Sequence, residues 1–235
     1  MASKKEYGEM IVEHLLEIRY SPSGSFLDQR GFVADYIRNE GILPHWQIDT
    51  NTIHFRDQSE KIDKEGAFAG FKNAGYIVYD PDTKNYFQDK SIKFWKTLSK
   101  NGHYDIPEIL RIGTRTKVFL PSEKDFQYLN DLIKEKVFSN NISKLMGNSI
   151  EDTQFIFVLK ESDFELRIVG GPIHKNEVQQ YIGFEHPQFE KTGIFLDIDI
   201  SKVGKIEQKD MVNLIKKSME MTWNKIDQIT AELGV

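Results

Sequence analysis

The sequence predicts an α+β fold: a twisted, largely antiparallel sheet with long helices packed on one face. Several short segments alternate apolar and polar residues with the period of a β-strand, and longer segments between them repeat with the period of a helix. The order strand, helix, strands, helix occurs twice, in halves at about 9–102 and 108–235. With 235 residues, 39% of them hydrophobic, we expect a single compact domain.

The first half begins with a strand at 10–20, where Val12, Leu16 and Ile18 share one face. The motif "SPSGS" breaks this strand, and a helix is expected to follow and to end near Gly41. Further strands are expected at 45–57, 66–75 and 76–80, and a helix at 87–102.

The second half repeats this order. We expect a strand at 108–120, a helix at 121–138, a hairpin at 153–171, a strand at 193–201 and a helix at 206–233. The final helix has apolar residues at spacings of three and four, which predicts a narrow stripe covering its own sheet. In an alternative interpretation, the stripe docks this helix on another subunit, as in an assembly protein or homo-oligomer. The stripe comprises Val212, Ile215, Met219, Thr222, Ile226, Ile229 and Leu233.

Composition excludes several classes of function. The net charge of −5 disfavours nonspecific binding to nucleic acid, which we expect only through a local basic face. The absence of cysteine removes thiolate chemistry and cysteine-ligated zinc. The N-terminal residues lack a secretory pattern, and no apolar run is long enough to cross a bilayer, so we expect a cytoplasmic protein without membrane contact. No cofactor motif is present, and no cofactor is expected.

One strand has an unusual charge pattern. In "RIGTRTKVFL", Arg111, Arg115 and Lys117 occupy alternate positions and therefore share a face. Gly113 between the arginines predicts a shallow spot open to a ligand. We interpret this helix-free face as a groove in which these cations and Arg167 hold an anionic or planar ligand, such as a nucleotide. Trp46 is expected to add a stacking surface.

A second strand carries the opposite charge. In "GIFLDIDIS", Asp197 and Asp199 occupy alternate positions, so they can neutralise the arginines across the sheet. In a further alternative, Asp197, Asp199 and Glu165 bind a divalent metal in a phosphodiesterase or nuclease. However, the nearest nuclease-like motif has Arg167 where lysine is required, and the six histidines show no metal-binding spacing. The sequence therefore favours a protein that is not an enzyme, and we assign no catalytic residue.

Three motifs resemble a sporadically distributed family of uncharacterised prokaryotic proteins. They are the opening "IVEHLLEIRYSP", the central Arg–Gly–x–Arg strand "RIGTRTKVFLP", and the strand "FLDIDIS" followed by a long helix ending "WNKIDQITAEL". The family often shows an aromatic residue and Asn where this chain has Thr116 and Lys117. The resemblance implies no established activity, but it suggests that the arginines and the "DID" acids form a recurring pattern. Families of this type often accompany mobile elements and antiviral defence systems.

The sequence therefore predicts a non-catalytic binding or regulatory protein. We expect it to recognise an anionic ligand or a partner protein through the arginine-bearing face of the sheet.

Overall fold

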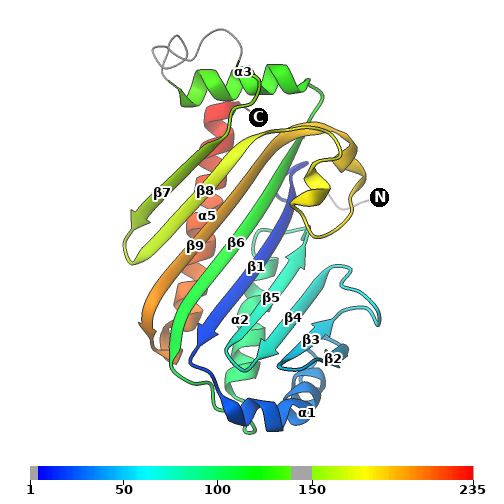
Figure 1. The fold of residues 1–235 in the computed structure, drawn as a ribbon, viewed down its shortest axis with the longest axis vertical. Coiled ribbons are helices and arrows are strands. Elements are labelled where there is room, and N and C mark those ends of the chain that lie inside the picture. The colour runs from blue at the N-terminus through cyan, green and yellow to red at the C-terminus, as the bar shows by residue number, and fades with distance from the viewer. Residues whose placement is uncertain (1–4, 139–149, 235) are drawn as a thin grey trace.

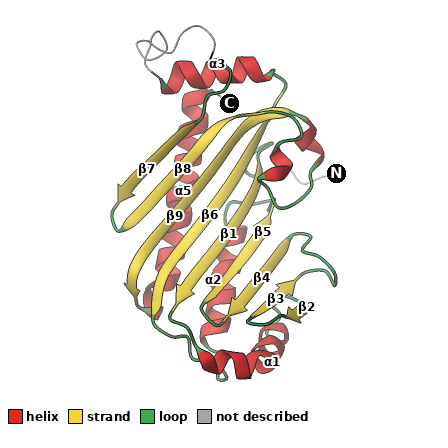
Figure 2. Cartoon of the chain, in the orientation of Figure 1, coloured by secondary structure: helices red, strands yellow, loops and turns green. Residues whose placement is uncertain are grey.

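The computed structural model describes residues 5–138 and 150–234. The described strands form one nine-stranded antiparallel sheet in the order β2-β3-β4-β5-β1-β6-β9-β8-β7 (Figures 1 and 2). The strands are β1 (Ile11–Tyr20), β2 (His45–Ile48), β3 (Thr52–Arg56), β4 (Glu65–Gly70), β5 (Asn73–Tyr79), β6 (Ile109–Ser122), β7 (Phe155–Glu161), β8 (Phe164–Ile173) and β9 (Thr192–Ile206). The helices are α1 (Gly24–Asn39), α2 (Tyr86–Ser99), α3 (Phe126–Val137) and α5 (Met211–Leu233).

The two halves of the chain meet at the centre of the sheet. β1 pairs with β6, and from this pair the first half extends outward as β5, β4, β3 and β2, whereas the second extends as β9, β8 and β7. Each half places a helix after its first strand and another after its last. The α+β class, the antiparallel sheet and the two similar halves are therefore confirmed.

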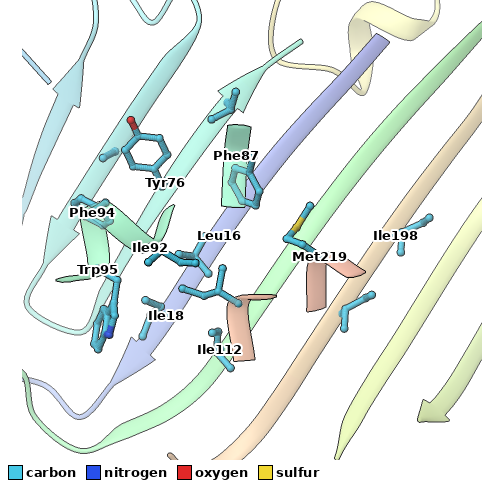
Figure 3. Close-up of a cluster of buried hydrophobic side chains, with 14 of the residues drawn as sticks. Leu16, Ile18, Tyr76, Phe87, Ile92, Phe94, Trp95, Ile112, Ile198 and Met219 are labelled. Atoms are coloured by element: carbon cyan, nitrogen blue, oxygen red, sulfur yellow. The ribbon is translucent and has the colours of Figure 1, made fainter. Parts of the chain in front are cut away.

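The long helices α2 and α5 lie behind the sheet in the view of Figure 1, and α3 crosses one end. The main core lies between these layers, where Leu16 and Ile18 of β1 meet Phe94 and Trp95 of α2 and Met219 of α5 (Figure 3). Each of these side chains is at most 2% exposed. Burial of one such side chain contributes roughly 1.5–3 kcal/mol. The apolar faces of the strands and of the helices therefore stabilise the fold by packing against each other in this layer.

The apolar stripe of α5 is buried against the chain's own sheet. Ile215, Met219 and Ile226 are at most 1% exposed and belong to the main core. Thr222 also lies inside, where its hydroxyl donates to the Ser218 carbonyl oxygen at 2.9 Å. The structure therefore agrees with the interpretation that this helix covers its own sheet, and only Val212 and Ile229 of the stripe are partly exposed. None of the described helices is long and apolar enough to span a membrane.

The opposite face of the sheet carries neither α2 nor α5, but it is partly covered. Residues 174–191, here called the strap, form two short 3₁₀ turns and lie in front of the sheet at one end (Figure 1). Strap residues join sheet residues in a second small core, formed by Ile11, Phe119, Ile173, Val178, Ile182 and Phe189. The remainder of this face, here called the open face, carries the predicted arginines Arg111, Arg115 and Arg167.

Candidate functional site

Ten charged side chains, here called the charge ladder, lie on the face of β1, β6, β9 and β8 that is opposite α2 and α5, and two of them, Glu13 and Lys117, lie under the strap. Strand register places Lys117 between Glu13 and Asp197, and Asp199 between Arg115 and Arg167. These neighbours carry charges of opposite sign, although Arg19 lies directly opposite Arg111, and the five cations of the ladder balance its five carboxylates. The cations are Arg19, Arg111, Arg115, Lys117 and Arg167, and the carboxylates are Glu13, Glu17, Glu165, Asp197 and Asp199.

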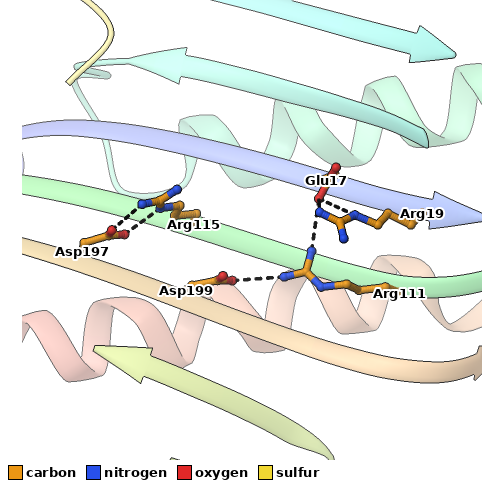
Figure 4. Close-up of polar contacts among 6 residues, drawn as sticks. All are labelled: Glu17, Arg19, Arg111, Arg115, Asp197 and Asp199. Atoms are coloured by element: carbon orange, nitrogen blue, oxygen red, sulfur yellow. Dashed lines mark hydrogen bonds and ion pairs between the residues drawn. The ribbon is translucent and has the colours of Figure 1, made fainter. Parts of the chain in front are cut away.

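Arg115 and Asp197 form the best-aligned pair in the ladder. Nε of Arg115 lies 2.8 Å from Oδ1 of Asp197, and Nη2 lies 2.5 Å from Oδ2 (Figure 4). The Asp197 side chain is only 11% exposed, whereas that of Arg115 is 46% exposed. The hydrogen bonds to Asp197 raise the pKa of Arg115 above its ordinary value. The Asp197 carboxylate is thus fully engaged, while part of the guanidinium group remains accessible.

Arg111 bridges the strands on either side of its own. Its Nη1 donates to Glu17 on β1 at 3.2 Å, and its Nη2 lies 3.4 Å from Asp199 on β9 (Figure 4). The guanidinium group lies over Gly113, within 2.7 Å of where a Cβ atom would be. The shallow spot predicted at Gly113 is therefore filled by Arg111, and it does not admit a ligand.

Lys117 lies beneath the strap, and its side chain is only 19% exposed. Its Nζ donates to Glu13 at 2.6 Å and to the carbonyl oxygen of Tyr181 at 2.6 Å. Glu13, which is only 5% exposed, also accepts from the Gly183 N–H at 2.5 Å. The Lys117 ammonium group thus has a carboxylate and a carbonyl partner within the chain and holds the strap on the sheet, and its role in ligand binding stays a prediction.

The structure does not bring Trp46 near the arginines. Trp46 lies in β2, at the edge of the sheet farthest from β7, and it pairs in register with Phe55. Directly opposed residues of an antiparallel pair share a face, and Phe55 is fully buried in the main core. Trp46 therefore packs on the helix-covered face, and its predicted stacking role is not compatible with the fold.

Arg167 lies in a cavity of about 480 Å³ between the sheet, the strap and the start of α3. Among the described residues it has no hydrogen bond or ion pair, although Asp199 lies opposite it in register. The ring of Phe126 stacks on that of His174 with their centroids 3.7 Å apart. The lining also includes Arg115, Asp197, Tyr181, Phe195, and the acidic residues Glu151, Asp152 and Glu177.

The three carboxylates proposed for a metal site do not converge. Asp197 accepts from Arg115 through both oxygens, and Asp199 lies beside Arg111. Glu165 pairs in register with Ser201 and not with either aspartate. Burial raises the pKa of Asp199, an effect that Arg111 and Arg115 oppose. Within residues 5–138 and 150–234 there is no group of three or more histidine or acidic side chains arranged to hold a metal ion.

Sequence reasoning missed the strap and its contacts with Glu13. The signal was present in "VQQYIGFEHPQFE", where Val178, Ile182 and Phe189 are apolar residues within a polar, irregular segment. Such residues in a segment without regular structure indicate that it packs on a sheet or helix.

Comparison with models of known protein families gave no match, and none of the curated proteins matched the sequence. The interpretation of this surface therefore rests on its own geometry.

Proposed function

We propose that this protein is a non-catalytic binding or regulatory protein. The open face of its sheet recognises a ligand or partner protein that presents an anionic group. The observation that carries this proposal is the position of Arg167, which lines the cavity without a carboxylate partner among the described residues. The anionic group would enter the cavity beside Arg167 and contact the accessible part of Arg115.

The chemistry of the two arginines supports an anionic anchor. A guanidinium group offers five N–H donors in a planar array, and Asp197 engages only two of the nitrogen atoms of Arg115. A carboxylate or phosphate bound here would accept charge-assisted hydrogen bonds, each contributing about 1.5–3 kcal/mol. The Phe126–His174 stack and the rings of Tyr181 and Phe195 supply apolar area for the remainder of the ligand.

The charge balance favours one discrete anionic group over a polyanion. The ladder has as many carboxylates as cations, and Glu151, Asp152 and Glu177 add negative charge to the cavity lining. A chain of phosphates crossing this face would meet those carboxylates, and the net charge of −5 would repel it at longer range. We therefore favour an acidic side chain of a partner protein, or a small ligand with one anionic group.

The test uses short peptides with a central glutamate, matched peptides with glutamine, and inorganic phosphate. Binding is followed by NMR chemical shifts of the full-length protein. Glutamate peptides should perturb Gly171 and His174, and Arg167→Ala should weaken their binding by about tenfold or more, because a charge-assisted hydrogen bond is lost. Equal binding of the glutamate and glutamine peptides would contradict the proposal.

Arg19→Ala is the matched control. Arg19 belongs to the same charge ladder, and its side chain is 57% exposed, but it does not line the cavity. This variant should bind glutamate peptides as tightly as the wild type. If Arg19→Ala and Arg167→Ala weakened binding equally, the effect would arise from the general field of the face and not from the cavity.

A further inference from the structure

β7 is an edge strand with apolar side chains exposed on both of its faces. Ile156, Phe157, Val158 and Leu159 are 59%, 45%, 61% and 41% exposed. Ile156 and Val158 lie on the open face, because they pair in register with Val169 and Arg167. Phe157 and Leu159 lie on the helix-covered face. An edge strand of this kind exposes both apolar surface and unpaired backbone groups.

The two edges of the sheet differ in this respect. β2, at the opposite edge, has only four residues and follows Pro44, and two of its side chains, His45 and Gln47, are exposed and polar. Short length, proline and polar side chains are features that protect an edge strand from pairing. β7 has seven residues, and its segment from Phe155 to Leu159 contains neither a charge nor a proline. Within residues 5–138 and 150–234, the features that protect an edge strand are thus present at β2 and absent from β7.

The hairpin fixes which backbone groups of β7 are free. Glu161 pairs with Phe164 across the two-residue turn, so these residues direct their N–H and C=O groups toward each other. Every second residue before Glu161, including Leu159 and Phe157, likewise directs its N–H and C=O groups toward β8. Ile156, Val158 and Lys160 therefore direct their backbone groups away from the sheet. A partner must be a strand that supplies matching donors and acceptors.

We propose that β7 pairs antiparallel with β7 of a second copy of this chain, with Phe157 opposite Phe157 on the twofold axis. In this register Ile156 lies opposite Val158 of the second copy, and Phe155 lies opposite Leu159. Each pair consists of two apolar residues on the same face, as direct antiparallel neighbours require. The pairing joins the two sheets into one continuous sheet. The proposal rests on β7 alone and is independent of the proposed ligand site.

The charges at the ends of β7 agree with this register. Lys160 lies opposite Gln154 of the second copy and diagonal to its Asp152, within reach of a long side chain. No like charges are directly opposed between Gln154 and Lys160. A shift of two residues in one direction places Lys160 opposite Ile156, and a shift in the other places Val158 opposite Gln154. Both shifts break an apolar pair, so the strand sequence selects the register centred on Phe157.

The first test is the mass of the full-length protein, measured by sedimentation over a range of concentrations. The weight-average mass of the wild type should rise toward twice the monomer mass, and Val158→Lys should remain monomeric at the same concentrations. Val203→Lys is the matched control, because Val203 is 74% exposed on β9, two strands away from β7 in the sheet order, and this variant should dimerise like the wild type. A wild type that stays monomeric, or a Val158→Lys dimer of unchanged affinity, would overturn the proposal.

The second test identifies the register of the β7–β7 pairing, and it does not depend on introducing a charged residue such as the lysine of Val158→Lys. The chain contains no cysteine, so a single introduced cysteine reports only on its own position. Across the proposed axis, residue 157 forms a pair without backbone hydrogen bonds, in which Cβ atoms lie about 4.5–5.5 Å apart, close enough for a disulfide after small movements. Phe157→Cys should form a covalent dimer on mild oxidation. Leu159→Cys should not, because its two copies lie about 13 Å apart along the strands. Equal cross-linking of the two variants would overturn this register.

Discussion

The guanidinium group of Arg111 occupies the space beside Gly113 that a side chain would need. A Cβ atom at position 113 would lie 2.7 Å from Nη1 of Arg111. The absence of a side chain at Gly113 therefore lets Arg111 lie flat on the sheet, where it bridges Glu17 and Asp199.

Gly113→Ala should displace Arg111 and break its ion pair with Glu17. The protein should stay folded and lose about 1 kcal/mol or less, because the group that must move is the end of a flexible side chain and such pairs are weak. Urea unfolding measures the loss, and a crystal structure of the variant would show the displaced guanidinium group. An unmoved Arg111 would contradict this account.

Gly75→Ala provides a matched comparison, because Gly75 lies across from Glu17 on its other side. A Cβ atom at position 75 would collide with the carbonyl oxygen of Leu16 and with the ring of Phe68. The backbone oxygen cannot move without disrupting the β1–β5 pairing. We therefore expect Gly75→Ala to cost about 2–3 kcal/mol, on the scale of overpacked cores. Similar losses in the two variants would show that the identity of the colliding group does not decide the cost.

Glu13 and Lys117 provide a second prediction, on the attachment of the strap. Glu13→Ala leaves the Lys117 ammonium group largely buried without its carboxylate, and it removes the acceptor of the Gly183 N–H. We expect a loss of about 2–4 kcal/mol in urea unfolding, together with faster proteolysis within residues 174–191.

The double variant Glu13→Leu, Lys117→Met separates ion pairing from packing. Replacing both charges with apolar side chains of similar size removes the unpaired ion, so most of the stability lost in Glu13→Ala should return. If the double variant were less stable than the single variant, the ion pair itself would be the dominant contribution.

Asp197→Asn tests the role of the central ion pair. The substitution removes the charge that compensates Arg115, so phosphate and glutamate peptides should bind the cavity more tightly than in the wild type, by about threefold to tenfold. A metal-dependent enzyme would respond in the opposite way, with loss of bound Mg²⁺ or Mn²⁺. Titration of both kinds of ligand into the same variant distinguishes the two functions, and unchanged affinity for anions would contradict the assigned role of Asp197.

The sequence predicted most elements of the fold because their periodicity is local, but the single strand expected at 45–57 is two strands, β2 and β3, and the break expected between 75 and 76 lies at 71–72. The hairpin turning at Glu161, Ser162 and Asp163 was expected, and it is observed between β7 and β8. The shared face of Arg111 and Arg115 follows from strand geometry alone and is also observed. Proximity of Trp46 to the arginines depended instead on strand order, which periodicity does not determine. Pairing across the sheet places β2 at the far edge.

The missed parts of the site are those that depend on tertiary contacts. The accessibility of Lys117 depends on the strap, a segment some 60 residues away in the chain. The carbonyl oxygen of Tyr181 in the strap accepts a hydrogen bond from the Lys117 ammonium group. Similarly, Gly113 was expected to leave space, but the space is filled by the side chain of Arg111 two residues earlier. The alternation of residues along a strand shows which side chains share a face of the sheet. It does not show which other segments of the chain cover that face.

His14 is a buried histidine on the helix-covered face of β1. It is fully buried, its Nδ1 lies 2.9 Å from Oγ1 of Thr116, and its ring stacks on Phe87. Its Nε2 has no hydrogen-bond partner among the described residues. Burial among these groups lowers the pKa of His14 from 6.5 to about 3, because the charged imidazolium cannot be solvated there.

This shift predicts that stability falls as the pH is lowered below 6.5. The unfolded chain then binds a proton at His14 that the folded protein cannot bind until the pH approaches 3. Between pH 7 and pH 4, the wild type should therefore lose about 3 kcal/mol more of its unfolding free energy than His14→Phe loses. Urea unfolding at a series of pH values measures this difference, and contributions from the carboxylates and His186 cancel because both proteins contain them. If His14→Phe kept the wild-type pH dependence, the acid sensitivity would have to arise from other groups.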